Sequence, residues 1–271
     1  MVLINGLPED RIPVTDRGFA YGDGVFRTLV ARVDKPLCWG LHYAKLCSDC
    51  ERLSLQAPDE EVLLDEIESV AQGMTESVVK IIVTRGQGER GYAMSAQARP
   101  TRIVSSSLLP IYPEIYESEG IKVRLCELRL ADQPRLAGIK HLNRLENVLA
   151  AAECSDAQIA EGLMLDAAGH VIEGTRSNLF IARDNRLITP DLSRCGVAGV
   201  QRDRVIAYAG TRAIPLQIRD VTLPEVLDAD ELFLVNSVIG VWPVRALAGR
   251  RWNDFSFAGL LQQLDAQERG G

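Results

Sequence analysis

The chain has 271 residues, of which 46% are hydrophobic and 25% charged, and its formal net charge is −7 at pH 7. This composition is typical of a globular protein with one large domain or two smaller ones. The negative charge excludes a general attraction to nucleic acid or anionic lipid. No apolar run approaches the roughly 18 residues of a membrane helix, and Met1 to Asn5 is no signal sequence, so we expect a cytoplasmic protein.

The six cysteines do not form a metal-binding pattern. Cys47 and Cys50 have a C-x-x-C spacing, but neither a second pair nor a nearby set of histidines accompanies them. We therefore expect reduced structural thiols, which suit the cytoplasm, and no metal site.

The first half of the chain predicts strands accompanied by a pair of helices, an α+β layer. A tight turn at Gly22 to Gly24 precedes a strand in which Arg27 and Thr28 fall on opposite faces. Apolar spacing predicts strands at 2–6, 25–33, 77–84 and 102–108, and helices at 42–55 and 60–72.

Two prolines and a glycine interrupt both the helical and the strand pattern between residues 109 and 120. We therefore expect a small α+β domain over 1–112, a linker over 113–120 and a larger domain over 121–271. In the larger domain, the pattern predicts strands at 121–130, 163–166, 170–173, 179–182, 215–221 and 231–235, and a helix at 202–210.

The stretch Gly86 to Gly91, GQGERG, matches the G-x-G-x-x-G fingerprint of dinucleotide-binding folds. The match fails in context, because residues 92–100 show no amphipathic helix and no βαβ unit surrounds the glycines. A glycine-rich loop that carries Arg85 and Arg90 is better suited to hold an anion, since an arginine fork binds a carboxylate with two hydrogen bonds.

Residues 137–149, AGIKHLNRLENVL, have the apolar spacing of a buried helix, with Lys140 at its beginning. The positive end of the helix dipole and burial would both favour the neutral amine, which is the nucleophilic form. An ordinary surface lysine beside a helix start would show the same pattern.

Glu173 lies between two predicted strands, where a carboxylate is often simply solvated. Together with Lys140 it fits the division of labour in a pyridoxal phosphate site, which needs a lysine for the aldehyde and an acid for the ring nitrogen. The N–H groups of Val200 and Gln201 at a helix start, and Ser237 after a strand, could hold the phosphate.

Seven motifs follow one another over nearly the whole chain: DRGFAYGDGVF, H-x-x-K-L at His42 to Leu46, TRGQGERGY, GIKHLNRLENVL, EGTRSNLF, GVAGVQRD and NSVIGVWPV. In order and spacing they resemble the motifs of fold type IV pyridoxal phosphate enzymes. The resemblance implies an α/β (α+β) fold with a small N-terminal α+β domain and a larger C-terminal pseudo-barrel, and a homodimer.

The resemblance also implies residue roles. Lys140 would bind the cofactor covalently and Glu173 would pair with the ring nitrogen. Lys45 stands where the family usually has an arginine, so it would supply a charge without the two-pronged grip. The remaining implied roles are phosphate binding by Val200, Gln201 and Ser237, substrate binding by Arg90, Tyr92, Asn236 and Phe26, and proton transfer or positioning by Thr28.

Within this family, RGQGERGY, AGIKHLNRLE and Thr28 most resemble the lyases that cleave 4-amino-4-deoxychorismate to 4-aminobenzoate and pyruvate in folate biosynthesis. Many of the aminotransferases instead carry a glutamate after the GDGVF turn, where this chain has Arg27. The alternatives are a D-amino acid or branched-chain aminotransferase of the same fold, and a binding protein of this fold without catalysis.

Overall fold

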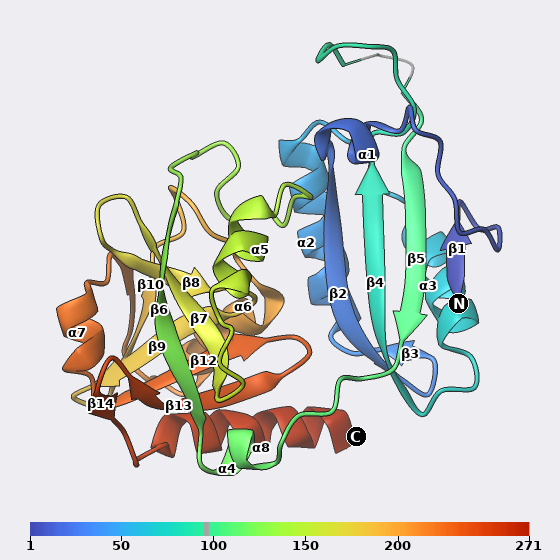
Figure 1. Cartoon of the computed structure of the whole chain (residues 1–271). Helices are drawn as coiled ribbons and strands as arrows, with labels where there is room; N and C mark the ends of the chain where they lie inside the picture. The colour runs from blue at the N-terminus through green and yellow to red at the C-terminus, as the bar shows by residue number, and fades with distance from the viewer. Residues whose placement is uncertain (95–97, 271) are drawn as a thin grey trace. The chain divides into compact units, whose positions relative to one another are not determined.

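The computed structural model describes residues 1–94 and 98–270 and divides the chain into two compact units (Figure 1). The first unit contains Met1–Pro110 and Ile139–Asn143, and the second contains Ile111–Gly138 and Arg144–Gly271. Residues 113–120, where we expect a linker, carry the short helix α4 (Ile115–Ser118) and belong to the second unit. Of residues 92–100, where we expected no helix, 95–97 lie outside the described residues.

The first unit is an antiparallel sheet with two longer helices against it. The strand order is β1-β5-β4-β2-β3, and the strands and helices predicted from apolar spacing are confirmed to within a few residues. The elements are β1 (Val2–Ile4), α1 (Arg17–Tyr21), β2 (Gly24–Arg32), β3 (Lys35–Pro36), α2 (Trp39–Arg52), α3 (Glu60–Ala71), β4 (Glu76–Thr84) and β5 (Thr101–Ser107).

One face of this sheet forms the core of the first unit. Alternate side chains of β2, such as Val25 and Leu29, pack with Leu46 from α2 and Leu63 from α3, and all four are fully buried. Removal of such side chains from water stabilises the unit by about 1.5–3 kcal/mol each. Phe26 and the other alternate residues of β2 face away from this core, so β2 presents a second face.

The second unit contains a closed barrel made of β6, β7, β8, β9, β12 and β13. The pairing of Glu173 in β8 with Asn178 in β9 closes the ring, and β10 and β11 extend the sheet beyond β9. The strands are β6 (Ile121–Leu130), β7 (Ile159–Asp166), β8 (Val171–Gly174), β9 (Asn178–Arg183), β10 (Arg186–Pro190), β11 (Leu216–Arg219), β12 (Glu231–Asn236), β13 (Gly240–Leu247) and β14 (Arg250–Arg251).

Four further helices accompany the barrel strands in the second unit. They are α5 (Leu145–Ala152), α6 (Val200–Thr211), α7 (Leu223–Leu227) and α8 (Ser256–Gly270). The sequence interpretation missed α1 and β3 in the first unit. In the second unit it missed α4, β10, α7, β13, β14 and α8. Among the described residues, none of the helices combines the length and apolar character that crossing a membrane requires.

The predicted helix over 137–149 is wrong in its first half. Gly138 has φ +78°, Ile139 is buried in the core of the first unit, and the helix begins only at Leu145. Leu145 is 74% exposed, so the expected buried face is also wrong. Lys140 therefore lies outside the helix, and the argument from the helix dipole does not apply to it.

Candidate functional site

The segment 139–143 lies beside the first residues of β2 and positions Lys140. The Phe26 N–H donates to the Lys140 carbonyl at 2.9 Å, and the Leu142 N–H donates to the Gly24 carbonyl at 3.0 Å. The ammonium nitrogen of Lys140 lies 4.6 Å from the centroid of the Phe26 ring, on the face of β2 that is turned away from the core. The backbone of Lys140 is thus fixed, while its side chain is half-buried.

A buried ion pair lies directly beneath the Lys140 backbone. The Asp49 carboxylate in α2 accepts the Lys140 N–H at 3.0 Å and pairs with the Arg27 guanidinium from β2. Arg27 also donates to the carbonyl of Lys45 at 3.2 Å. Burial raises the pKa of Asp49, and the charge of Arg27 opposes this rise without cancelling it. One ion pair thus connects the backbones of both lysines predicted to bind the cofactor.

Thr28 follows on the same face of β2 as Phe26, as strand alternation predicts. It is half-buried, and its neighbour across the sheet is Lys80 of β4. The Lys80 ammonium lies 5.2 Å from the centroid of the Phe26 ring. The structure thus brings Phe26, Lys80 and Lys140 together, and the proposed role of Thr28 stays a prediction.

The two arginines of the glycine-rich loop after β4 lie in different environments. Arg85 is buried and donates two hydrogen bonds to Asp23, at 2.8 and 2.9 Å, and two more to backbone carbonyls of Leu53 and Ser54. The prediction that Arg85 helps to clamp an external anion is therefore wrong, because Asp23 and the carbonyls occupy its guanidinium. Arg90 is exposed and Tyr92 is 85% exposed, so the structure leaves both side chains accessible.

In the second unit, Glu173 lies in β8 and is 3% exposed. One of its carboxylate oxygens accepts the Val197 N–H at 2.8 Å. Gly196 precedes with φ +81°, and a Cβ there would lie 3.3 Å from the same carboxylate oxygen and 2.8 Å from Ile172. The loop before α6 therefore approaches β8 so closely at Gly196 that a larger residue would collide with Ile172.

Asn178, at the start of β9, holds the other end of this loop. Its amide oxygen accepts the Gly199 N–H at 3.0 Å and its amide nitrogen donates to the Val197 carbonyl at 2.7 Å. Because Glu173 and Asn178 pair across β8 and β9, the two side chains together attach the loop to the barrel. This role of Asn178 was not anticipated from the sequence.

The loop leads into the first turn of α6, which begins at Val200. The N-cap is Gly199, and no side chain caps the helix start. The Gln201 amide group points elsewhere, since it donates to Asp265 of α8 at 3.0 Å. The backbone N–H groups of Val200 and Gln201 therefore form an uncapped, electropositive helix end, which favours an anion.

The turn after β12 contains Asn236 and Ser237. The Asn236 amide oxygen accepts the N–H groups of Val238 and Ile239 at 2.8 and 2.9 Å, and its nitrogen donates to the Arg176 carbonyl at 3.1 Å. Asn236 thus shapes the turn that presents Ser237. Its predicted contact with substrate stays a prediction.

Asp49 and Arg27 are the clearest features that sequence reasoning missed. Arg27 shares the face of β2 that carries Val25 and Leu29, and Asp49 falls on the buried face of α2 with Leu46 and Cys50. A buried charge requires a counter-charge, so two opposite charges on facing apolar surfaces are a readable signal.

The chain belongs to the amino-transferase class IV family, whose model matches residues 24–247. It is 37% identical to an aminodeoxychorismate lyase from Vibrio harveyi over 97% of this chain and 98% of that protein. It is also 28% identical to a D-alanine aminotransferase from Bacillus licheniformis, over 92% of this chain and 89% of the relative.

A solved structure gives the same result at the level of the fold. The crystal structure of 4-amino-4-deoxychorismate lyase from Pseudomonas aeruginosa matches with a TM-score of 0.94 and 46% identity, and the match covers 98% of each chain. The expected fold, a small α+β unit and a larger barrel unit, is therefore confirmed.

Proposed function

We propose that this chain is a pyridoxal phosphate-dependent lyase that converts 4-amino-4-deoxychorismate to 4-aminobenzoate and pyruvate. The observation that carries the proposal is similarity along almost the whole length to two proteins that bear this activity in their names, at 37% and 46% identity. The D-alanine aminotransferase is the more distant relative, at 28% identity.

The chemistry of the available groups fits pyridoxal phosphate. The uncapped start of α6 can accept a phosphate, and the loop before it is attached to Glu173, whose buried carboxylate suits a protonated ring nitrogen. Lys140 supplies an amine on a fixed backbone. Bound pyridoxal phosphate would supply the electron sink that stabilises negative charge on the substrate carbon.

The residues of the chain then divide the work. Lys140 would hold the cofactor, and its freed amine would remove the proton from the amine-bearing carbon of the substrate. Glu173 would hold a proton at the ring nitrogen. The exposed Arg90 anchors a substrate carboxylate, and Thr28 positions Lys140 or passes a proton to the departing enolpyruvyl oxygen. Loss of that side chain yields an aromatic product, which drives the elimination forward.

A product assay tests the activity directly. Purified protein loaded with pyridoxal phosphate is expected to release 4-aminobenzoate and pyruvate from aminodeoxychorismate. Conversion of the cofactor to its amine form by D-alanine or a branched-chain amino acid, without 4-aminobenzoate release, would instead establish an aminotransferase. A protein whose absorbance does not respond to added pyridoxal phosphate would establish a binding protein without this cofactor.

Two variants test the residue roles within the same assay. Lys140→Ala is expected to abolish turnover and the absorbance of covalently bound cofactor, since no other amine takes its place in the proposal. Glu173→Gln should retain cofactor but lose at least about a hundredfold in turnover, because the neutral amide cannot hold the ring nitrogen protonated. Full activity in either variant would contradict the assigned role.

The proposal includes a cytoplasmic homodimer that binds neither nucleic acid nor membrane. The net charge of −7 supports the last point, since it repels both kinds of polyanion. Light scattering coupled to size exclusion is expected to give twice the 29.8 kDa chain mass, and a monomeric mass would contradict the dimer.

A further inference from the structure

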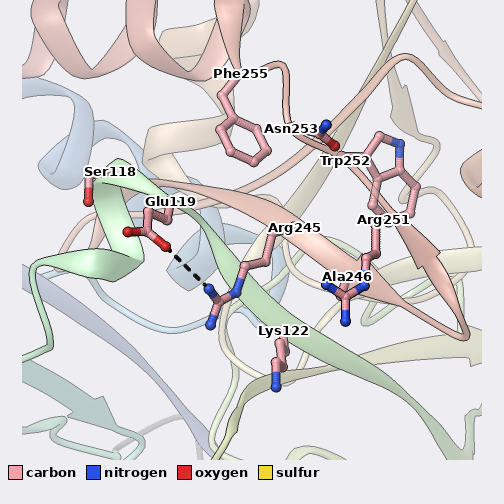
Figure 2. A pocket seen from close by; sticks show the side chains of 9 residues that line it. All are labelled: Ser118, Glu119, Lys122, Arg245, Ala246, Arg251, Trp252, Asn253 and Phe255. Carbon is pink, nitrogen blue, oxygen red and sulfur yellow. Dashed lines mark ion pairs between the residues drawn. The ribbon is translucent and has the colours of Figure 1, made fainter.

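A hollow of about 670 Å³ in the second unit contains none of the predicted site residues. Three cationic side chains line it, Lys122 from β6, Arg245 from β13 and Arg251 from β14 (Figure 2). Among its nine lining residues Glu119 is the one acid, so three positive charges and one negative charge leave a local balance of +2. This balance contrasts with the net charge of −7 of the whole chain.

A β-bulge turns Arg245 toward the hollow. Val244 pairs with Ile121 of β6, whereas Ala246 pairs with the very next residue, Lys122, so Arg245 is an extra residue in β13. Val244 is fully buried in the barrel core, but Arg245 and Ala246 both line the hollow. Bulges break strand alternation and re-aim side chains, which accounts for two consecutive residues at one surface.

The other two cations belong to a row across three strands. Ala246 pairs with Lys122 on one side and with Arg251 on the other. Residues paired in this way project from the same face of a sheet. Because the middle residue is an alanine, the space between the two long cationic side chains stays open, and Figure 2 shows Lys122, Arg245 and Arg251 extending toward the same side.

The Arg245 guanidinium is incompletely satisfied. Its Nε atom is buried and has no hydrogen-bond partner among the described residues. Its Nη1 atom lies 3.6 Å from Glu119, whose side chain is 65% exposed. A buried donor on a cation is costly when unmet, so the neighbours of Arg245 do not fully compensate its charge. The side chain as a whole is 32% exposed, which leaves its guanidinium able to donate to an oxygen of a bound anion.

We propose that this hollow, defined by Lys122, Arg245, Ala246 and Arg251, binds the phosphate or pyrophosphate group of a small metabolite. Two net positive charges match a phosphate dianion, and a concave volume of this size accommodates a small molecule. The Phe255 side chain, which also lines the hollow, offers an apolar surface to the rest of the ligand. The proposal is independent of the reaction proposed above.

Inorganic pyrophosphate is the probe for this site. We would titrate it calorimetrically into protein loaded with pyridoxal phosphate, at an ionic strength held constant with potassium chloride. Loading occupies the predicted cofactor phosphate site, so that it does not contribute. We expect saturable binding with one site per chain, which the double substitution Arg245→Gln and Arg251→Gln weakens at least about tenfold.

Two further variants sharpen the result. Ala246→Glu places an acid at the centre of the row and is expected to weaken binding to a similar extent, without removal of either arginine. Arg183→Gln in β9, which removes a half-exposed arginine paired with Asp228 outside the hollow, is the matched control and should leave the affinity unchanged. Thermal unfolding verifies that each variant is folded.

The proposal is overturned if the wild-type protein shows no saturable binding at millimolar pyrophosphate. It is equally overturned if folded Ala246→Glu and double-arginine variants bind as tightly as Arg183→Gln does. Neither outcome would affect the product assay for the lyase reaction, so the two proposals fail separately.

Discussion

At the scale of single residues, the buried pair of Arg27 and Asp49 is the feature with the largest expected effect on stability. Asp49→Ala leaves the Arg27 charge buried without its partner, which we expect to lower the unfolding free energy by about 3–5 kcal/mol. Urea unfolding of the cofactor-free protein measures this loss. Glu51→Gln, an exposed change in the same helix, should cost less than about 0.5 kcal/mol.

The double variant Arg27→Leu with Asp49→Leu separates the pairing from the packing. Because it removes both buried charges, we expect it to be more stable than Asp49→Ala alone. If the losses in the single variants Arg27→Leu and Asp49→Leu add up to the loss in the double variant, the two charges do not interact. If Lys140 has its proposed role, Asp49→Ala should also weaken cofactor retention, since the Lys140 N–H loses its acceptor.

The ionisation of Asp23 is expected to make the stability of the protein depend on pH in the acid range. Burial alone would raise the pKa of Asp23, but hydrogen bonds and charges from Arg85 and Arg17 hold it below 3.8. A carboxyl group whose pKa is lower in the folded than in the unfolded chain stabilises the fold at pH values above its unfolded-state pKa. This stabilisation is lost as the pH falls through the folded-state pKa. The stability difference between wild type and Asp23→Asn should therefore shrink progressively as the pH falls below about 5.

Urea unfolding at several pH values measures this difference. Asp65→Asn in α3 is the control, because Asp65 is exposed. A difference that is independent of pH would show that the Asp23 charge does not contribute through its ionisation.

At the scale of elements, the approach of segment 139–143 to β2 depends on Gly24. A Cβ at Gly24 would lie 2.4 Å from the Val83 carbonyl and 2.9 Å from the Leu142 side chain. Gly24→Ala should therefore lower the unfolding free energy by at least about 2 kcal/mol. Gly40→Ala in α2 meets nothing within 4 Å and should be neutral or stabilising by up to about 1 kcal/mol. Equal effects in urea unfolding would contradict the close approach.

Elements with a strong apolar period could be predicted, and those defined by distant partners could not. The alternation in β2 and the helical spacing in α2 and α3 are local, because each element buries one continuous face. Residues 137–149 show the opposite case. Their helical period is genuine, but Ile139 fits a core formed by residues far away in sequence, and the Lys140 N–H finds Asp49 rather than a helical carbonyl.

The candidate site follows the same rule. Its residue types and their order were readable, and motif similarity names Lys140 and Glu173. The contacts of Asn178 were not readable, since they join β9 to a loop whose position only the folded chain defines. The Arg27 and Asp49 pair left a signal in the sequence, but their contact with the Lys140 backbone did not. The misassigned Arg85 shows the limit, because a glycine-rich loop does not reveal that Asp23 already occupies the arginine beside it.

At the scale of the whole molecule, the reactivity of the cysteine thiols tests whether the cores of both units are closed to reagents. Burial raises the pKa of Cys50 in the first unit, and of Cys126 and Cys195 in the second, to about 12. In folded protein at pH 8, iodoacetamide is expected to spare these three and to modify the half-buried Cys38 and Cys47. Mass spectrometry of the digested protein identifies the modified sites. Rapid labelling of Cys126 without urea would contradict a closed core in the second unit.

The first unit is discontinuous in sequence, and this has a consequence for biosynthesis. Residues 1–110 leave the ribosome before residues 139–143, which supply Ile139 to the core and pair with β2. The nascent N-terminal half must therefore wait, with an apolar slot unfilled, until almost thirty more residues have been translated. A gene truncated after residue 110 would encode that incomplete intermediate permanently, so shortening the protein to its first unit would produce an aggregation-prone fragment.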